Sequence, residues 1–193
     1  HVEEDVSFGP LNLGLDAGTV RRRVDAALEA VGLRGHAGRA VHHLSFGQKK
    51  RVCIAGVLAM EPEVLLLDEP MAGLDAPMQL ELAALLDRLV DGGVTVLLST
   101  HDVDFAFGWA DEIHLLAAGR CIAAGPAAEM AARADLLHAA GHRVPLAIAL
   151  HAELAARGML QAHPAPRTVP ALLAALRALP APELFQTPGE TTA

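Results

Sequence analysis

Two stretches of the sequence carry residue types and spacings that suit phosphate chemistry. Leu44 to Arg51 reads LSFGQKKR, in which a serine and a glycine stand where a loop turns into a helix. The first N–H groups of a helix have no partner within it and bind anions readily. Val64 to Pro70 reads VLLLDEP, an apolar strand that ends in two adjacent carboxylates, Asp68 and Glu69. Such a pair supplies one ligand for a hard cation and one base for a water molecule, so the two stretches together predict phosphate, magnesium and hydrolysis.

Each residue type in the first stretch has a physical reason to stand where it does. Ser45 is a good N-cap, and its hydroxyl can also face a bound phosphate. Gly47 has no side chain, so a backbone N–H can approach a ligand closely there. The apolar residues after it form one stripe, which predicts a helix from Gly47 to Met60 that Pro62 ends. The alternative interpretation of this stretch is a capped surface helix.

The second stretch predicts a central strand of a parallel sheet. Val64 to Leu67 is apolar on both faces, which is typical of a strand covered on both sides. Asp68 and Glu69 follow at its carboxyl end, where open α/β sheets place their ligands. The alternative interpretation is an acid pair that caps a helix. Asp75 precedes a predicted amphipathic helix from about Pro77 to Leu89, and by position alone it would be the N-cap of that helix.

A second apolar strand, Val94 to Leu98, predicts that a histidine emerges at the same edge of the sheet. The sequence Ser-Thr-His-Asp follows this strand and includes His101. Because the carboxyl ends of parallel strands meet at one edge, we expect His101 to lie beside Asp68 and Glu69. The alternative is a structural histidine, which is the more common role for a lone histidine at a strand end.

The remaining elements surround these two strands and extend beyond them. Acidic residues at positions 3–5 suit the first turn of a helix, whereas Gly14 to Thr19 predicts a loop. The end of the chain from Gln186 to Ala193 is predicted to be disordered. The other predicted elements are helices at Val20 to Val31, Val103 to Ala110, Pro126 to Ala139, Pro145 to Arg157 and Val169 to Leu179, and a hairpin formed by Glu112 to Leu116 and Cys121 to Ala124.

Composition and charge exclude several classes of protein. The chain has 193 residues, of which 52% are hydrophobic, and its net charge is −8. This charge argues against a general polyanion binder, so we expect no nucleic acid partner. The longest apolar runs are far shorter than the ~20 residues that a bilayer-spanning helix needs, so we expect a soluble protein. Cys53 and Cys121 lack metal-ligand spacing and are predicted to be reduced core thiols.

Taken together, these residues resemble the ATP-binding subunit of ABC transporters, with Leu44 to Arg51 as the signature loop and Val64 to Glu69 as the Walker B strand. The resemblance covers roughly His1 to Arg157. It is strongest to the ATPase subunits of energy-coupling-factor importers, and among them to the cobalt-type ones. The segments that carry this narrower resemblance are Val2 to Val6, Phe8 to Pro10, His42 to Ser45, Gly47 to Val52, Ile54 to Met60 and Gly141 to Pro145. Phe46 and Met71 depart from the glycine and threonine that are common in the family.

The resemblance implies an α/β fold, namely a partial ABC ATPase domain of the P-loop NTPase type with a small helical C-terminal extension. The partial domain is expected at residues 1–132, with the helical signature subdomain at about 1–60 and the Walker B and H-loop part at about 61–132. Residues 133–193 are expected to form the helical extension and a flexible tail. The phosphate-cradling G-x-x-x-x-G-K-[ST] loop, the Q-loop glutamine and the adenine-stacking tyrosine are missing, so we expect an N-terminally truncated fragment.

The resemblance also implies what the residues at the sheet edge do with the cofactors ATP and Mg²⁺. Asp68 would hold magnesium, and Glu69 would orient or deprotonate the attacking water. His101 would contact the γ-phosphate. Phosphoryl transfer depends mainly on positioning and charge compensation, which this set of residues would supply.

A second ATPase subunit, identical or different, is the first partner that the resemblance implies. Ser45, Gly47 and Gln48 of one subunit would cap the γ-phosphate that the other subunit holds, and Asp75 would link the two sites. The segment Val2 to Leu13 would contact an integral membrane component of the transporter. The subunit is therefore expected at the cytoplasmic face of the cell membrane, where it would energise import of cobalt or another transition metal ion.

Two other functions remain open at this stage. One is an ABC-type ATPase without a transport role, and the other is a non-catalytic interaction module without its own nucleotide site. The sequence does not choose between cobalt, nickel and a vitamin as the cargo. The chain by itself is expected to bind ATP weakly and to be inactive as an ATPase.

Overall fold

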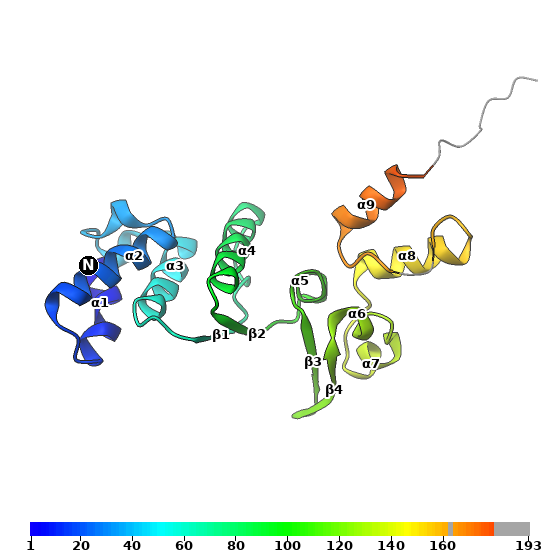
Figure 1. Cartoon of the computed structure of the whole chain (residues 1–193), viewed down its shortest axis with the longest axis horizontal. Helices are drawn as coiled ribbons and strands as arrows, with labels where there is room; N and C mark the ends of the chain where they lie inside the picture. The colour runs from blue at the N-terminus through cyan, green and yellow to red at the C-terminus, as the bar shows by residue number, and fades with distance from the viewer. Residues whose placement is uncertain (162–163, 180–193) are drawn as a thin grey trace, which may run out of the picture. The chain divides into compact units, whose positions relative to one another are not determined.

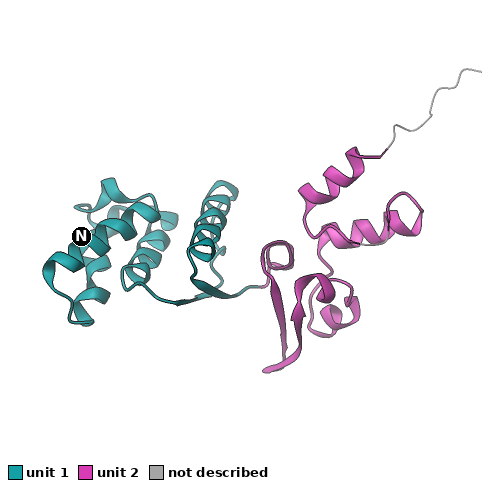
Figure 2. Ribbon diagram, in the orientation of Figure 1, with its two compact units in different colours: residues 1–100 teal, residues 101–193 magenta. Residues whose placement is uncertain are grey.

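The computed structural model describes residues 1–161 and 164–179, which form two compact units that divide between Thr100 and His101 (Figure 2). The two units are regions with many contacts within themselves. The domain boundary that the sequence predicts after residue 132 is a different division and stays a prediction. The predicted disordered segment from Gln186 to Ala193 lies outside the described residues. In the described ranges, no helix has the length and apolar character needed to cross a membrane.

Unit 1 contains both of the stretches that suit phosphate chemistry (Figure 1). Its elements, in chain order, are α1 (Val2–Asn12), α2 (Ala17–Ala30), the short 3-10 turns η1 (Arg34–His36) and η2 (Val41–His43), α3 (Phe46–Leu58), β1 (Val64–Asp68), α4 (Ala76–Asp91) and β2 (Thr95–Ser99). The predicted helices and strands of this unit are therefore present, with bounds within a few residues of those expected.

Helices α1, α2 and α3 pack against one another as a small helical layer (Figure 1). Val2 and Val6 lie one turn apart on α1 and are fully buried, because residues four apart share one face of a helix. Helix α2 begins within the predicted loop, since Asp16 accepts hydrogen bonds from the N–H groups of Gly18 and Thr19 at 2.9 and 3.1 Å. The residues after Asp16 are thus the first turn of a capped helix.

Strands β1 and β2 pair in parallel, and α4 packs on β2. The register aligns Leu66 with Leu97 and Asp68 with Ser99. A crossover helix is the usual connection between parallel neighbours, and α4 is the helix that connects these two. The packing brings the carboxyl ends of both strands to one edge.

The prediction that β1 is covered on both sides is wrong for the described residues. Leu65 is only 1% exposed, but its neighbours Val64 and Leu66 are 54% and 70% exposed, and Leu97 on β2 is 55% exposed. Successive side chains of a strand point to opposite faces, so these three residues share one face. In the part of the chain that the structure describes, the pair is covered on its other face only.

Unit 2 contains the predicted hairpin and the C-terminal helices (Figure 1). Its elements are α5 (Val103–Trp109), β3 (Glu112–Ala117), β4 (Arg120–Pro126), α6 (Ala127–Met130), α7 (Ala134–Ala139), α8 (Leu146–Ala156) and α9 (Val169–Arg177). Strands β3 and β4 are antiparallel. Ala118 and Gly119 form their turn with positive φ angles of 48° and 73°, which suit a tight hairpin.

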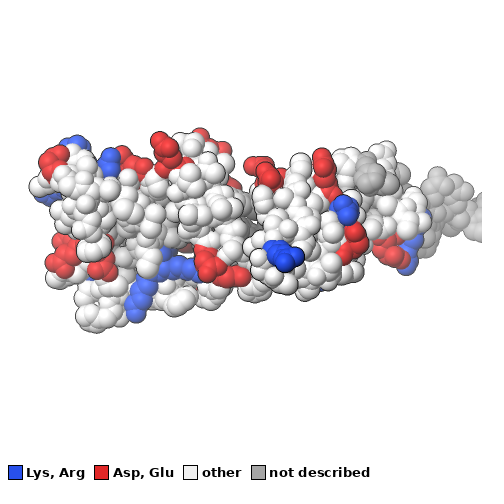
Figure 3. Space-filling model, turned by 90° about the horizontal axis from the view of Figure 1, so that it is seen from below, with Lys and Arg blue, Asp and Glu red and all other residues white. Residues whose placement is uncertain are grey.

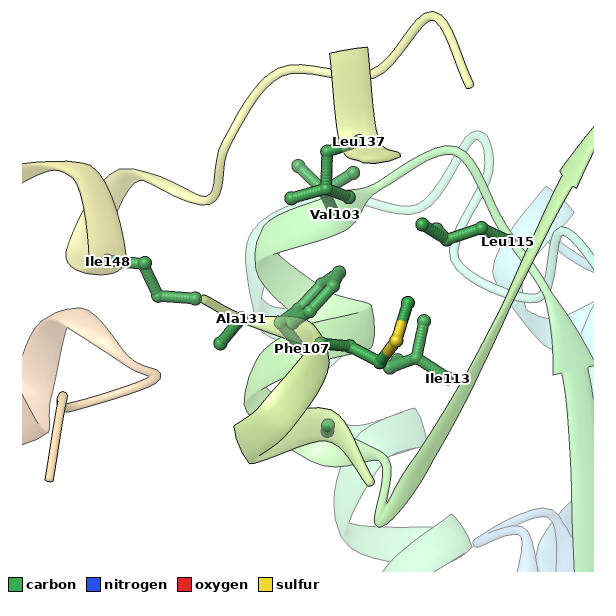
Figure 4. Close-up of a cluster of buried hydrophobic side chains, with 9 residues drawn as sticks. Val103, Phe107, Ile113, Leu115, Ala131, Leu137 and Ile148 are labelled. Carbon is green, nitrogen blue, oxygen red and sulfur yellow. The ribbon is translucent and has the colours of Figure 1, made fainter. Parts of the chain in front are cut away.

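A buried cluster around Phe107 forms the core of unit 2 (Figure 4). Phe107 on α5 is 1% exposed and Leu137 on α7 is fully buried. The close-up shows the Phe107 ring between residues of α5, β3 and the helices that follow the hairpin. The members of the cluster are Val103, Phe107, Ile113, Leu115, Ala127, Met130, Ala131, Leu137 and Ile148.

Two other predictions are wrong in detail. The single helix expected from Pro126 to Ala139 is interrupted, because the backbone of Arg133 leaves the helical region with φ −102° and ψ 61°. Both pieces, α6 and α7, pack on β3. Cys53 and Cys121 are free thiols, as predicted, but both are exposed and neither is part of the core. Cys53 lies between the buried residues Val52 and Ile54 of α3, so the buried face of this helix excludes it.

Within unit 2, the carboxylate of Asp104 joins α5 to the start of α8. It accepts hydrogen bonds from the Arg143 guanidinium and, at 2.6 Å, from the Leu146 N–H. Burial acts to raise the pKa of Asp104, but these two hydrogen bonds outweigh it and hold the pKa below its ordinary value of 3.8. Because α8 has no side-chain cap of its own, Asp104 supplies the acceptor at its N-terminus.

Replacing Asp104 by asparagine is therefore expected to destabilise unit 2 in a pH-dependent way. The lowered pKa means that ionised Asp104 stabilises the fold above pH 3.8, and that this contribution is lost as the pH falls through the folded-state pKa. Urea denaturation should show the Asp104→Asn variant less stable than the unaltered chain at neutral pH and equally stable in acid. The comparison variant is Asp135→Asn, which should show a smaller effect of the same sign, because Arg133 also lowers the pKa of Asp135 but this pair is exposed to solvent. A gap for Asp104→Asn that does not change with pH contradicts the expectation.

Candidate functional site

The candidate site lies at the carboxyl edge of the β1–β2 pair. Asp68 is the last residue of β1 and aligns with Ser99, the last residue of β2. Glu69 follows directly, and its backbone N–H donates a hydrogen bond to the Ser99 carbonyl at 2.9 Å. The parallel pairing thus continues one residue beyond the strand and fixes where both carboxylates start.

The hydroxyl groups that follow β2 contact both carboxylates. Ser99 Oγ donates to Asp68 Oδ1, and Thr100 Oγ1 donates to Glu69 Oε2 at 3.2 Å. Asp68 is exposed and Glu69 is half-buried. The two acidic side chains therefore lie at one edge, each oriented by a hydroxyl from the neighbouring strand, as the parallel-sheet argument predicts.

The backbone of Glu69 adopts a left-handed conformation with φ 46°. A residue with a Cβ rarely occupies this region, because it costs roughly 1–2 kcal/mol. Such backbone is found preferentially at functional sites, where the surrounding contacts hold it in place. Pro70, the next residue, is fully buried and fixes the start of the turn that follows.

The first stretch of the sequence forms the N-terminus of α3 as predicted. Ser45 is the N-cap, and its hydroxyl accepts a hydrogen bond from the Gln48 N–H at 3.2 Å. The Gln48 side chain in turn accepts the Ser45 N–H at 3.0 Å, which completes a capping box. Ser45 is exposed, as is Phe46, so this turn is accessible from outside the chain. The N–H groups of Phe46 and Gly47 are the first two of the helix.

Gly47 is buried, and its Cα faces α4 of the same chain. A Cβ built there would collide with the Met78 sulfur and would lie 3.6 Å from Leu74. The ring of Phe46 lies against Gly73 in the same way, 2.9 Å from where a Cβ would be. The absence of a side chain at Gly47 is thus explained by close packing on α4, and a ligand is not needed to account for it.

The two remaining predicted residues lie on other elements. Asp75 is the N-cap of α4 and accepts the Met78 N–H at 2.9 Å, as its position alone suggested. His101 lies two residues after the end of β2 and is the first residue of unit 2. Its predicted place beside Glu69 stays a prediction.

Comparison with known proteins decides the family. The sequence profile described as ABC transporter matches residues 2–72. A protein of Streptomyces coelicolor named as an ABC transporter ATP-binding protein is 51% identical over 174 residues, which are 90% of this chain and 61% of that protein. Residues 2–72 of the chain belong to an ABC transporter domain.

Other relatives of this ABC protein carry a narrower name. The energy-coupling factor transporter ATP-binding protein EcfA of Carboxydothermus hydrogenoformans is 50% identical over 76% of the chain and 54% of its own length. The solved structure of cbiO1 from Clostridium perfringens, described as part of the ABC transporter complex cbiONQ, has a TM-score of 0.63 and 41% identity. That match covers 77% of this chain and 60% of cbiO1. The ABC chain thus spans 61% or less of each of these relatives.

Three further residues of the ABC chain lie at the site and were not predicted from its sequence. They are Ser99 and Thr100, which hydrogen-bond the two carboxylates, and Lys50 on α3. The Lys50 ammonium donates to the carbonyl oxygens of Glu69 and Ala72, at 3.1 and 3.0 Å. These contacts join residues that lie 19 to 31 positions apart, so no local spacing reveals them.

Basic and acidic side chains are mixed on the surface of the ABC chain that Figure 3 shows, and the absence of a nucleic acid partner stays a prediction. On the face of unit 1 that Figure 3 shows, blue basic side chains lie next to red acidic ones. Unit 1 contains ion pairs such as Arg51 with Glu81 and Arg34 with Glu29. Paired charges of both signs do not form the continuous basic surface that a phosphate backbone requires.

Proposed function

We propose that the chain forms the hydrolytic edge and the signature segment of an ABC ATPase that binds ATP between two subunits. The observation that carries this proposal is the Asp68–Glu69 pair at the carboxyl end of β1, with Glu69 held at φ 46°. A half-buried carboxylate that is fixed by the backbone and by Thr100 suits a base that must meet a water molecule in one geometry.

Asp68 fits the role of a magnesium ligand. Mg²⁺ prefers oxygen ligands, keeps several waters and is usually bound by one or two carboxylates together with substrate phosphates. Asp68 is exposed and lies next to the Ser99 hydroxyl. The described ranges contain no cluster of three or more His, Cys, Asp or Glu side chains that could hold a metal ion without other ligands. When bound, the ion would neutralise charge on the phosphates. Asp68 would hold it, and the Ser99 hydroxyl would orient Asp68.

Glu69 would accept the proton of the attacking water, or orient that water, at its carboxylate. Thr100 holds one oxygen of this group, Oε2, at 3.2 Å. His101, which follows Thr100 in the chain, would contact the γ-phosphate. With the nucleophile and the phosphate both held, the barrier falls because reacting groups are positioned in advance.

The signature segment would act on the nucleotide of a second subunit. Ser45 is exposed at the N-terminus of α3, where the helix dipole and the leading N–H groups favour an anion. The Ser45 hydroxyl and the N–H groups of Phe46 and Gly47 would face the γ-phosphate, and Gln48 would orient Ser45 through the capping box. Asp75, at the start of α4, would link the two nucleotide sites.

We further propose that the subunit energises an energy-coupling-factor importer of cobalt or another transition metal ion at the cytoplasmic face of the membrane. Relatives named as energy-coupling factor transporter ATP-binding proteins support the transporter class, and the metal cargo rests on the sequence resemblance alone. Helix α1 also supports the proposal, since it buries Val6 and Pro10 but exposes the large apolar side chains Phe8 and Leu11, 70% and 56% respectively. Exposed apolar side chains next to a buried stripe are typical of a contact surface.

The apolar surface of α1 gives a test of the membrane partner. A suitable protein is a chimaera in which this chain replaces the corresponding region of the Streptomyces relative. Phe8→Asp should reduce co-purification of the chimaera with an integral membrane protein of the host by roughly tenfold or more, because a buried charge replaces an apolar contact. Leu116→Asp is the control, since Leu116 is similarly exposed on β3 of unit 2. Equal recovery with both variants would contradict the proposed contact.

A further inference from the structure

Lys50 connects two parts of the chain that the proposed function keeps separate. It lies on α3, two residues after Gln48 of the signature segment. Its ammonium donates hydrogen bonds to the carbonyl oxygens of Glu69 and Ala72, at 3.1 and 3.0 Å. These carbonyls stand at the two ends of the turn that follows β1, and the Ala72 N–H donates to the Glu69 carbonyl across that turn at 3.2 Å.

The turn between Glu69 and Ala72 has a backbone that needs such support. It opens with Glu69 at φ 46° and is followed by Gly73 at φ 74°. Glycine adopts this conformation without cost, whereas glutamate does not. Both peptide groups that flank Glu69 are held, because its N–H donates to the Ser99 carbonyl and its own carbonyl accepts from Lys50. The direction in which the Glu69 side chain leaves the backbone follows from these two bonds.

The positive charge of Lys50 strengthens its hydrogen bonds to the Glu69 and Ala72 carbonyls. Its side chain is only partly exposed, and burial lowers the pKa of Lys50 although the neighbouring Glu69 carboxylate acts to raise it. A hydrogen bond from an ionised donor is roughly twice as strong as one between neutral groups. Methionine has a stem of similar length without a donor, and arginine keeps a cationic donor, so both are informative replacements.

We propose that Lys50 is a positioning residue for ATP hydrolysis, which holds the backbone carbonyl of Glu69 and thereby aims the Glu69 carboxylate at the attacking water. This inference rests on the proposed function. It also means that the signature helix α3 and the hydrolytic carboxylate of one subunit move together.

The test measures kcat and ATP affinity of the chimaera with Lys50→Met, Lys50→Arg and a control. Arg88→Met is a matched control, because Arg88 on α4 also donates to a backbone carbonyl, that of Ala30, at 3.4 Å. Lys50→Met should lower kcat at least about tenfold with little change in ATP affinity, because a small displacement of a reacting group costs rate. Lys50→Arg should recover part of the loss, and Arg88→Met should leave kcat unchanged.

The outcomes separate this inference from the proposed function. If the unaltered chimaera does not hydrolyse ATP, or if Glu69→Gln leaves its turnover unchanged, the proposed function fails. If Glu69→Gln abolishes turnover but Lys50→Met keeps the unaltered kcat, or lowers kcat and ATP affinity together with stability, the role of Lys50 alone is overturned. If Lys50→Met does not fold, Lys50→Gln is used in its place, because the shorter glutamine amide reaches at most one of the Glu69 and Ala72 carbonyls. A kcat of Lys50→Gln equal to that of the unaltered chimaera would refute the inference.

Discussion

Replacing Glu69 by glutamine is expected to lower ATP turnover of the chimaera by roughly 10²–10⁴-fold while ATP affinity stays the same. The amide has nearly the shape of the carboxylate and can still accept the hydrogen bond from Thr100, which lies 3.2 Å from Oε2. It cannot take a proton from water. The variant therefore removes proton transfer and leaves the substrate contacts in place, so the loss should appear in kcat.

Glu63→Gln provides the matched control for this measurement. Glu63 is an exposed glutamate next to the other end of β1, and its carbonyl accepts the Thr95 N–H at 2.9 Å. The same chemical change there should leave phosphate release from ATP unaltered in a steady-state assay. Equal turnover in Glu69→Gln and Glu63→Gln would refute the assignment of Glu69 as the hydrolytic carboxylate.

Replacing Phe107 by alanine is expected to destabilise unit 2 by about 3–5 kcal/mol. The Phe107 ring is 1% exposed and belongs to the buried cluster shown in Figure 4. Its removal takes away contacts with α5, β3 and the helices after the hairpin, and the close-packed surroundings do not fill the cavity completely. A loss of this size is a large fraction of the stability of a typical domain.

Phe105→Ala is the control for this second prediction. Phe105 is half-buried on the same helix and stacks on Trp109 with the ring centroids 5.8 Å apart. An aromatic pair of this kind contributes roughly 0.5–1.5 kcal/mol beyond the area that it buries, so this change should cost less than loss of Phe107. Urea denaturation of both variants measures the difference. Equal free energies of unfolding would show that Phe107 is not a central residue of the core.

The elements that carry the candidate site could be predicted because their local signals agree. Two strands were predicted, one from the apolar run Val64 to Leu67 and one from the β-branched start of Val94 to Leu98. Each observed strand differs from its predicted bounds by one residue. Ser45 as an N-cap predicted the start of α3, and the structure adds a capping box with Gln48. Parallel pairing then brings Asp68 and Ser99 to one edge, as expected for strands joined by a crossover helix.

The burial of particular side chains could not be predicted from the same patterns. An apolar strand does not say how many elements cover it, and Leu66 on β1 is 70% exposed. A cysteine between apolar residues of a helix is not necessarily buried, as Cys53 shows. An alanine-rich segment favours helix but does not show where the chain must turn to pack on β3, which here happens at Arg133.

The spacing of residues along the sequence also could not predict the contacts that complete the site. The Thr100–Glu69 hydrogen bond follows from parallel pairing in a specific register. The Lys50 contacts depend on how α3 packs on the turn after β1. Gly47 shows the reverse case, since a glycine expected to admit a ligand is packed against Met78 of the same chain. Tertiary packing decides each of these.

The central claim is that ATP lies between the Asp68–Glu69 edge of one subunit and the Ser45 segment of another. The most direct test is whether two copies form a complex when ATP is present. The measurement is the molecular mass in solution of the Glu69→Gln chimaera, with Mg²⁺, in the presence and absence of ATP. Because this variant would retain ATP and hydrolyse it slowly, we predict a dimer with ATP and a monomer without it, and no ATP-dependent dimer when Ser45→Arg is added. A mass that does not depend on ATP would contradict the account.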